Sequence, residues 1–241
     1  MPWKWYDSEV VRIEKMSSTV LKFILEIEGE ENFDFKAGQF ITMDLPIHEK
    51  RLKRWRSYSI ANCPKGGNRI ELCIVYLEGG LASEYLFNKV KLGTKIRFKG
   101  PSGAFYLPEQ IENDIVMICT GTGVAPFRSM IFDLLANNKL NKRIKLIFGA
   151  RYREDILYRE EFEKLDAENP LFSYDICLSR DNDWEGYKGY VHQVYLQDES
   201  IDFSNSKFYL CGWSQMIDEA VERLQTEKEV DKSDIIYELY G

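Results

Sequence analysis

The chain has 241 residues, of which 44% are hydrophobic and 29% charged, and its formal net charge is −7. The length suits one large domain or two ordinary ones, the hydrophobic fraction excludes a wholly disordered chain, and the negative charge disfavours a nucleic-acid binder. The charge is unevenly divided, since residues 1–110 carry 17 basic and 14 acidic side chains, whereas residues 111–241 carry 15 and 25. Such asymmetry suggests two domains with different partners.

The first half of the chain predicts an antiparallel β-barrel or sandwich. Short β-rich runs recur at regular spacing between turns that contain Gly or Pro, and one short helix interrupts them. The expected strands cover residues 10–16, 19–27, 39–45, 57–61, 69–76 and 95–99, and the helix covers residues 83–89.

The second half predicts a doubly wound α/β domain. Residues 115–119 form a continuous apolar run, as expected of a strand that is buried on both faces. Strands at 144–148, 172–178, 207–211 and 235–239 alternate with helices at 126–137, 158–166, 191–196 and 214–226. This alternation is typical of a parallel sheet. We therefore expect an antiparallel barrel domain over residues 1–110 and an α/β domain over residues 111–241.

The cysteines and the N-terminus indicate a cellular compartment. The five cysteines form no C-x-x-C pair and have no iron–sulfur spacing, so neither a disulfide framework, a metal site nor a cluster is expected; they are Cys63, Cys73, Cys119, Cys177 and Cys211. The first residues, starting Met1-Pro2-Trp3, lack the layout of a secretory signal. No run approaches the ~20 apolar residues of a membrane span. These features predict a cytoplasmic protein.

A glycine-rich turn between a buried strand and a helix is the strongest chemical signal. It reads Thr120-Gly121-Thr122-Gly123-Val124-Ala125-Pro126. Glycines let backbone N–H groups approach an anion, and the helix N-terminus that follows adds free donors and a positive dipole end. Pro126 suits the first helical turn, where no N–H is missed. A plain strand–helix turn is the alternative interpretation.

Three further segments are weaker signals when taken singly. Alternation along a strand puts Arg56 and Tyr58 of Arg56-Ser57-Tyr58-Ser59 on one side, as a cation beside an aromatic plate. In Gly79-Gly80-Leu81-Ala82-Ser83 we expect Ser83 to cap a helix whose start presents donors to a phosphate. Cys211-Gly212 lies at the carboxyl end of a strand, where doubly wound sheets bind ligands, although a buried structural thiol also explains Cys211.

The order and spacing of these segments resemble the ferredoxin–NADP⁺ reductase superfamily. Arg56-x-Tyr58-Ser59 resembles its flavin motif, Gly80-x-x-Ser83 its flavin-phosphate motif, and Gly121-Thr122-Gly123-x-Ala125-Pro126 its nicotinamide-nucleotide loop. Three more segments match: Gly100-Pro101-x-Gly103-x-Phe105, Phe148-Gly149-x-Arg151 with the following Asp155-x-Leu157-Tyr158, and Cys211-Gly212. The resemblance covers nearly the whole chain.

The resemblance implies a flavin-binding barrel and an NAD(P)-binding α/β domain with FAD between them. Hydride would pass between nicotinamide and flavin, and single electrons would pass between flavin and an acceptor. The implied flavin contacts are Arg56, Ser57, Tyr58, Ser59, Gly80, Leu81, Ala82, Ser83 and Tyr240, and the implied catalytic set is Ser59, Cys211, Glu238 and Tyr240. Gly241 follows Tyr240, whereas the aromatic residue is terminal in the plant-type branch, so a merely packed edge-strand tyrosine is the alternative.

The implied nucleotide contacts are Thr120, Gly121, Thr122, Gly123, Pro126, Arg151, Ser179, Arg180, Lys188, Tyr190, Cys211 and Gly212. Arg180 and Lys188 suit the adenosine 2′-phosphate of NADPH, because a guanidinium matches phosphate geometry. Asp181 keeps NADH as the alternative, because a carboxylate binds the ribose hydroxyl in NAD-type sites.

The expected electron partner is a separate ferredoxin or flavodoxin. The basic residues Lys50, Arg51, Lys53 and Arg54 precede the flavin motif and would attract such an acidic carrier, although a plain exposed basic loop explains them equally well. Two other functions stay open: an NADH-dependent reductase component of an oxygenase or similar multi-component system, and a non-catalytic nucleotide-binding subunit of a larger complex.

Overall fold

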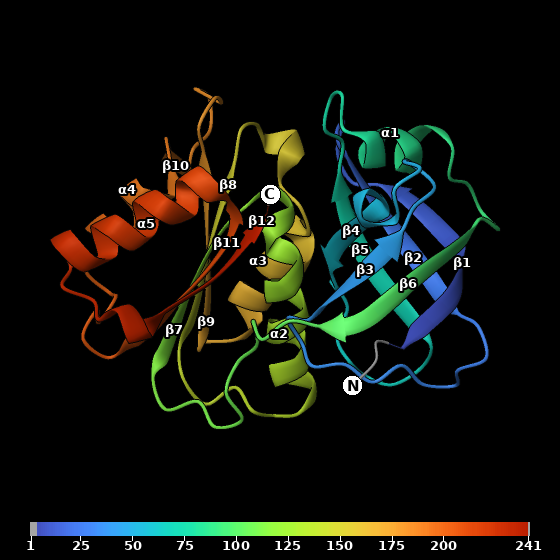
Figure 1. Ribbon diagram of the computed structural model, residues 1–241. Coiled ribbons are helices and arrows are strands. Elements are labelled where there is room, and N and C mark those ends of the chain that lie inside the picture. The colour runs from blue at the N-terminus through green and yellow to red at the C-terminus, as the bar shows by residue number, and fades with distance from the viewer. Residues whose placement is uncertain (1–3, 241) are drawn as a thin grey trace. The chain divides into compact units, whose positions relative to one another are not determined.

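The computed structural model describes residues 4–240, so Met1-Pro2-Trp3 and Gly241 lie outside the described residues. The backbone packs as two compact units (Figure 1). One runs up to Leu107 and includes Ala125–Asn137, and the other comprises Pro108–Val124 and the chain from Asn138 onward. The boundary between residues 110 and 111 stays a prediction.

The first unit is built on one antiparallel six-stranded sheet in the order β4-β3-β6-β1-β2-β5. Just beyond β4, Ile60 forms an isolated bridge with Leu72 of β5, and the Ala61 N–H donates to the Glu71 carbonyl at 2.8 Å. The two edge strands therefore meet, and the sheet closes as the barrel that the sequence predicts. The strands are β1 (Trp5–Lys15), β2 (Val20–Ile27), β3 (Phe40–Asp44), β4 (Trp55–Ser59), β5 (Arg69–Val75) and β6 (Lys95–Ser102), with helix α1 (Leu81–Asn88) and the 3₁₀ turn η1 (Arg51–Arg54).

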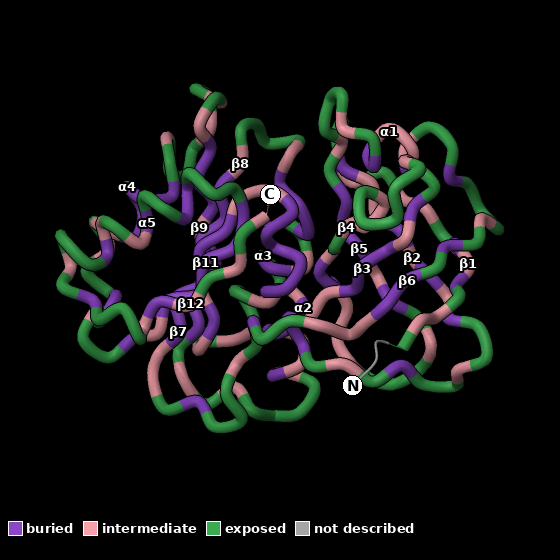
Figure 2. The backbone as a smooth tube through the Cα atoms, in the orientation of Figure 1, coloured by how far each residue is buried: buried purple, intermediate pink, exposed green. Residues whose placement is uncertain are grey.

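The barrel core consists of the inward positions of these strands. Phe23, Leu25 and Phe98 are fully buried, and Leu86 of α1 joins the same cluster. Buried and partly buried residues follow one another along β2, as Figure 2 shows. Burying such side chains contributes roughly 1.5–3 kcal/mol each, so this cluster supplies a large part of the barrel's stability.

The second unit is built on one parallel six-stranded sheet in the order β10-β9-β8-β7-β11-β12. Phe162 of α3 packs on Tyr174 and Phe172, whereas Val191 of α4 and Ile217 of α5 pack with Ile118 on the opposite face, an arrangement that Figure 1 shows. The predicted doubly wound sheet is confirmed. Its elements are β7 (Asp114–Thr120), η2 (Gly121–Gly123), β8 (Ile144–Ala150), η3 (Arg153–Asp155), α3 (Arg159–Glu168), β9 (Phe172–Leu178), β10 (Tyr187–Lys188), α4 (Val191–Gln197), β11 (Ser206–Trp213), α5 (Ser214–Glu227), η4 (Lys232–Asp234) and β12 (Ile235–Tyr240). Helix α2 (Val124–Ala136) follows η2 in the chain but belongs to the first unit from Ala125 onward.

The strand boundaries differ from the prediction in a few places. β1 begins at Trp5 rather than Val10, because Trp5 pairs with Lys99 of β6, far along the chain. β4 begins at Trp55 rather than Ser57, since Trp55 pairs with Asp44. β10 has only two residues, which pair with Cys177 and Leu178 of β9, and no local hydrophobic pattern predicts this strand. All three differences arise from pairing with another strand, which for β1 lies far along the chain and for β4 and β10 is the preceding strand.

Helix α2 is fastened to the barrel through polar side chains. The Arg128 Nη1 donates to the Ala61 carbonyl at 2.8 Å and is 3.2 Å from Glu71 Oε1, while Ser129 Oγ donates to the Asn62 carbonyl at 2.7 Å. These contacts explain why residues 125–137 belong to the first compact unit. Across residues 4–240, no helix combines the length and the apolar character needed to cross a membrane.

Gly38 provides a test of the packing at this end of the barrel. Its φ is +99°, and a Cβ there would overlap the Phe105 carbonyl oxygen and the Met130 methyl group. We expect Gly38→Ala to lower the free energy of unfolding by about 2–4 kcal/mol. Gly29, with φ +71° and open space around it, is the matched control, and Gly29→Ala should cost about 1–2 kcal/mol. Urea unfolding followed by circular dichroism measures both, and equal losses would contradict the steric explanation.

Candidate functional site

The parallel sheet has one switch point, between β7 and β11. From β7 the chain proceeds through β8 and β9 on one side, and it then returns to place β11 and β12 on the other side. In open α/β sheets the crevice at the carboxyl ends of such strands is where ligands bind. The glycine-rich turn follows β7, and Cys211-Gly212 lies near the end of β11, so topology brings these two predicted segments together.

The contact between these segments is made by backbone atoms. A Cβ on Gly123 would overlap the Cys211 carbonyl oxygen, and one on Gly212 would lie 2.5 Å from Thr120 Oγ1. Gly121 has φ +53° and open space around its Cβ position, while Thr122 and Pro126 are buried. The turn therefore has glycine at the position where the backbones are crowded, and it has open space beside Gly121. Together these features form a cradle that is suited to a pyrophosphate.

Cys211 is a buried thiol in register with Glu238 of β12 and Cys119 of β7. Burial, and to a lesser degree the Glu238 carboxylate, raises the pKa of Cys211 well above its usual range, while the nearby Tyr240 side chain opposes this shift. Cys211 is thus a neutral thiol at physiological pH, suited to contact and positioning rather than to nucleophilic attack. The predicted residues Cys211, Glu238 and Tyr240 lie together at the carboxyl end of the sheet.

Basic side chains gather where β8 and β9 end. Arg151 follows β8 and Arg180 follows β9, and the Arg180 N–H donates to the Arg151 carbonyl at 2.9 Å. Ser179 is joined in the same way to Ala150 at 3.0 Å. Both arginine side chains are exposed, and neither guanidinium has a hydrogen-bond or ion-pair partner among residues 4–240. The predicted residues Arg151, Ser179 and Arg180 therefore form one connected group.

Lys188 and Tyr190 lie on the next segment of the same edge. Lys188 pairs with Leu178 of β9, and its Nζ donates to the Asn182 carbonyl at 2.8 Å. Tyr190 is 69% exposed at the start of α4, where its N–H donates to Gln193 Oε1 at 3.0 Å. An exposed ring at this position is available for stacking on a planar ligand.

In the barrel, Arg56 and Tyr58 lie on the same side of β4, as predicted, since they pair with Met43 and Ile41 two positions apart. Burial raises the pKa of Tyr58 to about 12, and the Arg56 charge acts in the opposite direction. Arg56 Nη1 donates to the carbonyls of Lys53 and Trp55 at 3.0 and 2.8 Å. The guanidinium is thus anchored by its own turn.

Ser57 and Ser59 share the other side of β4, because they are also two positions apart, but they differ in exposure. Ser57 is exposed and its Oγ lies 3.0 Å from Thr42 Oγ1, whereas Ser59 is only 4% exposed. The predicted flavin segment therefore presents one hydroxyl outward and holds the other in the barrel wall.

The expected capping role of Ser83 is wrong, because α1 begins two residues earlier and its N-cap is Gly80. Ser83 lies within the first turn, where its Oγ donates to the Leu77 carbonyl at 2.7 Å and accepts from the Leu77 N–H at 3.1 Å. Its role is to hold the preceding loop against the helix. Gly79, with φ +73° and open space beside it, leaves the approach to this helix start clear.

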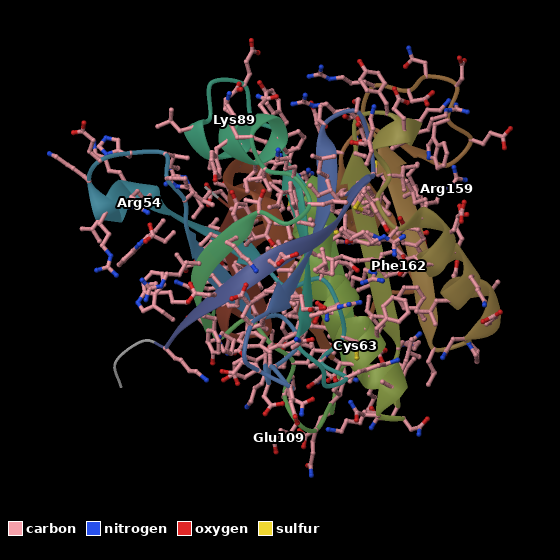
Figure 3. The ribbon with its side chains drawn as sticks, turned by 90° about the vertical axis from the view of Figure 1, so that its right-hand side faces the viewer. Arg54, Cys63, Lys89, Glu109, Arg159 and Phe162 are labelled. Carbon is pink, nitrogen blue, oxygen red and sulfur yellow. The ribbon has the colours of Figure 1, made fainter. Side chains whose placement is uncertain are left out.

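The predicted basic docking residues lie on η1 and next to it. Lys50, Arg51 and Lys53 are exposed, and Figure 3 shows Arg54 on the same turn at the periphery of the barrel. Arg54 differs from the others, because its Nε lies 2.8 Å from Asp44 Oδ1 and also donates to the Leu45 carbonyl. Arg51 lies over the Trp5 and Trp55 rings at 5.3 and 5.7 Å.

Sequence reasoning missed Arg153, which ion-pairs with Asp181 through Nε at 2.8 Å from Oδ2. Arg153 lies in η3 after β8, and Asp181 lies after β9. Equivalent positions after neighbouring parallel strands are adjacent in space, so the strand assignment together with the opposite charges was an available signal.

Comparisons with known proteins agree with this geometry. Residues 7–106 match the family model described as "Oxidoreductase FAD-binding domain", and residues 117–222 match "Oxidoreductase NAD-binding domain". The chain is 32% identical to ferredoxin–NADP reductase B of Sorangium cellulosum, over 98% of this chain and 97% of that protein. It is 35% identical to the phenol 2-monooxygenase reductase component DmpP of Pseudomonas sp. (strain CF600), over 83% of this chain but only 56% of that longer relative.

Solved structures share the fold. A ferredoxin reductase in carbazole 1,9a-dioxygenase superposes with a TM-score of 0.84 at 23% identity, covering 100% of this chain and 70% of that one. A ferredoxin NADP⁺ reductase from Neisseria gonorrhoeae with bound FAD and NADP superposes with a TM-score of 0.78 at 22% identity, covering 98% of both chains.

Tyr58 offers a test of the burial of the barrel segment. Its pKa is higher in the folded chain than the usual value near 10, so the stability it contributes is complete below pH 10 and is lost as the pH rises towards 12. Between pH 9 and 11 the wild type should lose about 1 kcal/mol more free energy of unfolding than Tyr58→Phe. Urea unfolding at the two pH values measures this difference, and identical losses would show that Tyr58 is solvated.

Proposed function

Because the chain belongs to the ferredoxin–NADP⁺ reductase superfamily of flavin-dependent NAD(P)H oxidoreductases, we propose that it transfers hydride between NADPH and FAD and single electrons between FAD and a separate carrier such as ferredoxin or flavodoxin. The observation that carries this proposal is the cradle at the switch point, where Gly123 and Gly212 bring the glycine turn against Cys211. The similarity along 97% of a ferredoxin–NADP reductase supports it.

The barrel residues fit FAD. Arg56 supplies a fixed cation for the pyrophosphate, Tyr58 an aromatic face, and the exposed Ser57 a hydroxyl, whereas the flavin contact of the buried Ser59 stays a prediction. The start of α1, from Gly80 to Ser83, adds backbone donors on an open approach. Bound FAD would supply hydride acceptance and one-electron release, which no side chain of this chain can perform.

In the α/β domain we assign positioning roles to Cys211, Glu238 and Tyr240. Cys211 stays a neutral thiol because it is buried, so it would contact the nicotinamide without covalent chemistry. Glu238 adds a negative charge beside it, and the Tyr240 side chain lies near the thiol. Thr120 to Gly123 and the start of α2 would bind the pyrophosphate of the nucleotide.

We propose NADPH as the nucleotide because Arg151 and Arg180 are exposed and connected at the strand ends. Two guanidinium groups in this position suit a 2′-phosphate, and Lys188 and Tyr190 would add a cation and an adenine-stacking ring. An NADH-dependent oxygenase reductase component is the second candidate, which the similarity to the phenol 2-monooxygenase component favours.

The deciding experiment uses one purified sample. Its flavin is released and identified, and kcat/KM is then measured with NADPH and with NADH. A higher kcat/KM with NADH would favour the oxygenase-component function. A protein without flavin, or one unable to reduce ferricyanide with either nucleotide, would instead favour a non-catalytic nucleotide-binding subunit. The five cysteines, all within residues 4–240, form no disulfide, and we propose the cytoplasm, a reducing compartment, as the place of action.

Arg180→Ala tests the phosphate site. Loss of one charge-assisted contact is worth about 1.5–3 kcal/mol, so the KM for NADPH should rise at least about tenfold while the KM for NADH stays nearly unchanged. Steady-state kinetics with both nucleotides measures this. Arg143→Ala is the matched control, since Arg143 is an exposed arginine at the opposite end of β8, paired with Asp114. A parallel rise for both nucleotides would contradict the assignment.

We propose that the carrier docks on Lys50, Arg51 and Lys53. Arg54 contributes less, because Asp44 already neutralises it. Three exposed cations on one turn, with Leu52 75% exposed among them, suit an acidic protein that also has an apolar contact.

Reversing these three charges to glutamate should lower kcat/KM for ferredoxin reduction about tenfold at low ionic strength and weaken its salt dependence. Reduction of a neutral quinone should be unchanged. Lys139→Glu, at an exposed lysine after α2, is the control. An unaltered salt dependence in the triple variant would remove η1 from the docking surface.

A further inference from the structure

The loops after β8 and β9 are joined into one layer at the carboxyl edge of the sheet. Backbone hydrogen bonds link Ser179 to Ala150 and Arg180 to Arg151 at 3.0 and 2.9 Å. This pairing sets Asp181, the next residue, opposite Arg153 of η3. The layer holds the cations assigned to the 2′-phosphate and also a carboxylate of the kind that binds a ribose hydroxyl.

The Asp181 carboxylate is fully engaged within this layer. Arg153 Nε donates to Oδ2 at 2.8 Å and Nη2 donates to Oδ1 at 3.2 Å, and Oδ1 also accepts from the Asp183 N–H at 3.1 Å. The Asp181 side chain is only 13% exposed, against 52% for Arg153. The geometry is bidentate and one partner is covered, which sets this pair apart from the exposed ion pairs of little value.

The Arg153 guanidinium also contacts an aromatic ring, that of Trp184. It lies 6.0 Å from the centre of this ring, and Arg159 lies 5.2 Å from the same ring. Trp184 Nε1 donates to the Ile176 carbonyl at 3.4 Å, so the ring is tied to β9. Arg159, labelled in Figure 3 at the start of α3, pairs with Glu163 rather than with Asp181.

Two physical consequences follow for a nucleotide at this edge. A carboxylate whose oxygens already accept three hydrogen bonds has little capacity left for a ribose diol. A carboxylate neutralised by a bidentate guanidinium also repels a 2′-phosphate much less than a bare one does. The pair therefore removes both properties by which Asp181 would favour NADH.

We propose that Arg153 is a specificity-determining residue, which masks Asp181 and thereby lets the site accept a 2′-phosphorylated nucleotide. This inference rests on the proposed function, since it concerns the nucleotide that the same site uses. It assigns the selectivity to a pair of residues rather than to the cations Arg151 and Arg180 alone.

The test is a double-mutant cycle with Arg153→Leu and Asp181→Asn, in which kcat/KM is measured with NADPH and with NADH. Arg153→Leu should lower the NADPH/NADH ratio at least tenfold. Adding Asp181→Asn to that variant should restore the ratio at least fivefold, whereas Asp181→Asn alone should change it less than threefold. Arg159→Leu removes a neighbouring cation without touching Asp181, and should leave the ratio within twofold of wild type.

Equilibrium binding of NADP⁺ and NAD⁺ is measured by calorimetry for the four proteins of the cycle, which are the wild type, the two single variants and the double variant. This readout does not need turnover. If the binding ratios follow the cycle while no protein turns over either nucleotide, the masking role stands and the proposed reductase activity fails. An unchanged ratio in Arg153→Leu, or equal effects of Asp181→Asn in both backgrounds, would overturn the masking role. Unaltered melting temperatures would show that all variants are folded.

Discussion

The nucleotide half of this protein depends on how closely the turn after β7 approaches the backbone of β11. Gly123 would meet the Cys211 carbonyl with any side chain, and Gly212 would meet Thr120. Because the two loops leave the sheet in opposite directions at this point, close approach of their backbones leaves N–H groups and a helix start facing outward. The register that brings Cys211 beside Glu238 follows from the same strand pairing.

The electrostatic environment at this edge of the sheet depends on the nearby side chains rather than on the net charge of the domain. Residues 111–241 carry 25 acidic and 15 basic side chains, yet the strand ends that would receive a phosphate expose Arg151 and Arg180. Asp181, a carboxylate at the same edge, is paired with Arg153. Since attraction between charges falls with distance and with screening, these few neighbours outweigh distant acidic residues.

The barrel holds a cation, Arg56, and an aromatic ring, Tyr58, in fixed positions on the same side of β4. Closure of the sheet through Ile60 and Leu72 leaves β4 firmly paired. Arg56 is then anchored by carbonyls of the preceding turn, and that turn displays the cations proposed for docking. Rigid placement of this kind lowers the entropic cost of binding a ligand or partner.

The sequence by itself determined the two architectures, including the parallel sheet of the α/β half, and it located the motif segments that we propose for the flavin and nucleotide sites, because periodicity and glycine turns are local signals. Tertiary structure decided the rest. The start of β1 needed a partner far along the chain, and the start of β4 needed its pairing with β3. The start of α1 at Leu81 placed Ser83 inside the helix, and Arg153 met Asp181 only because β8 and β9 are adjacent. Pairing between distant segments leaves no mark in a short window of sequence.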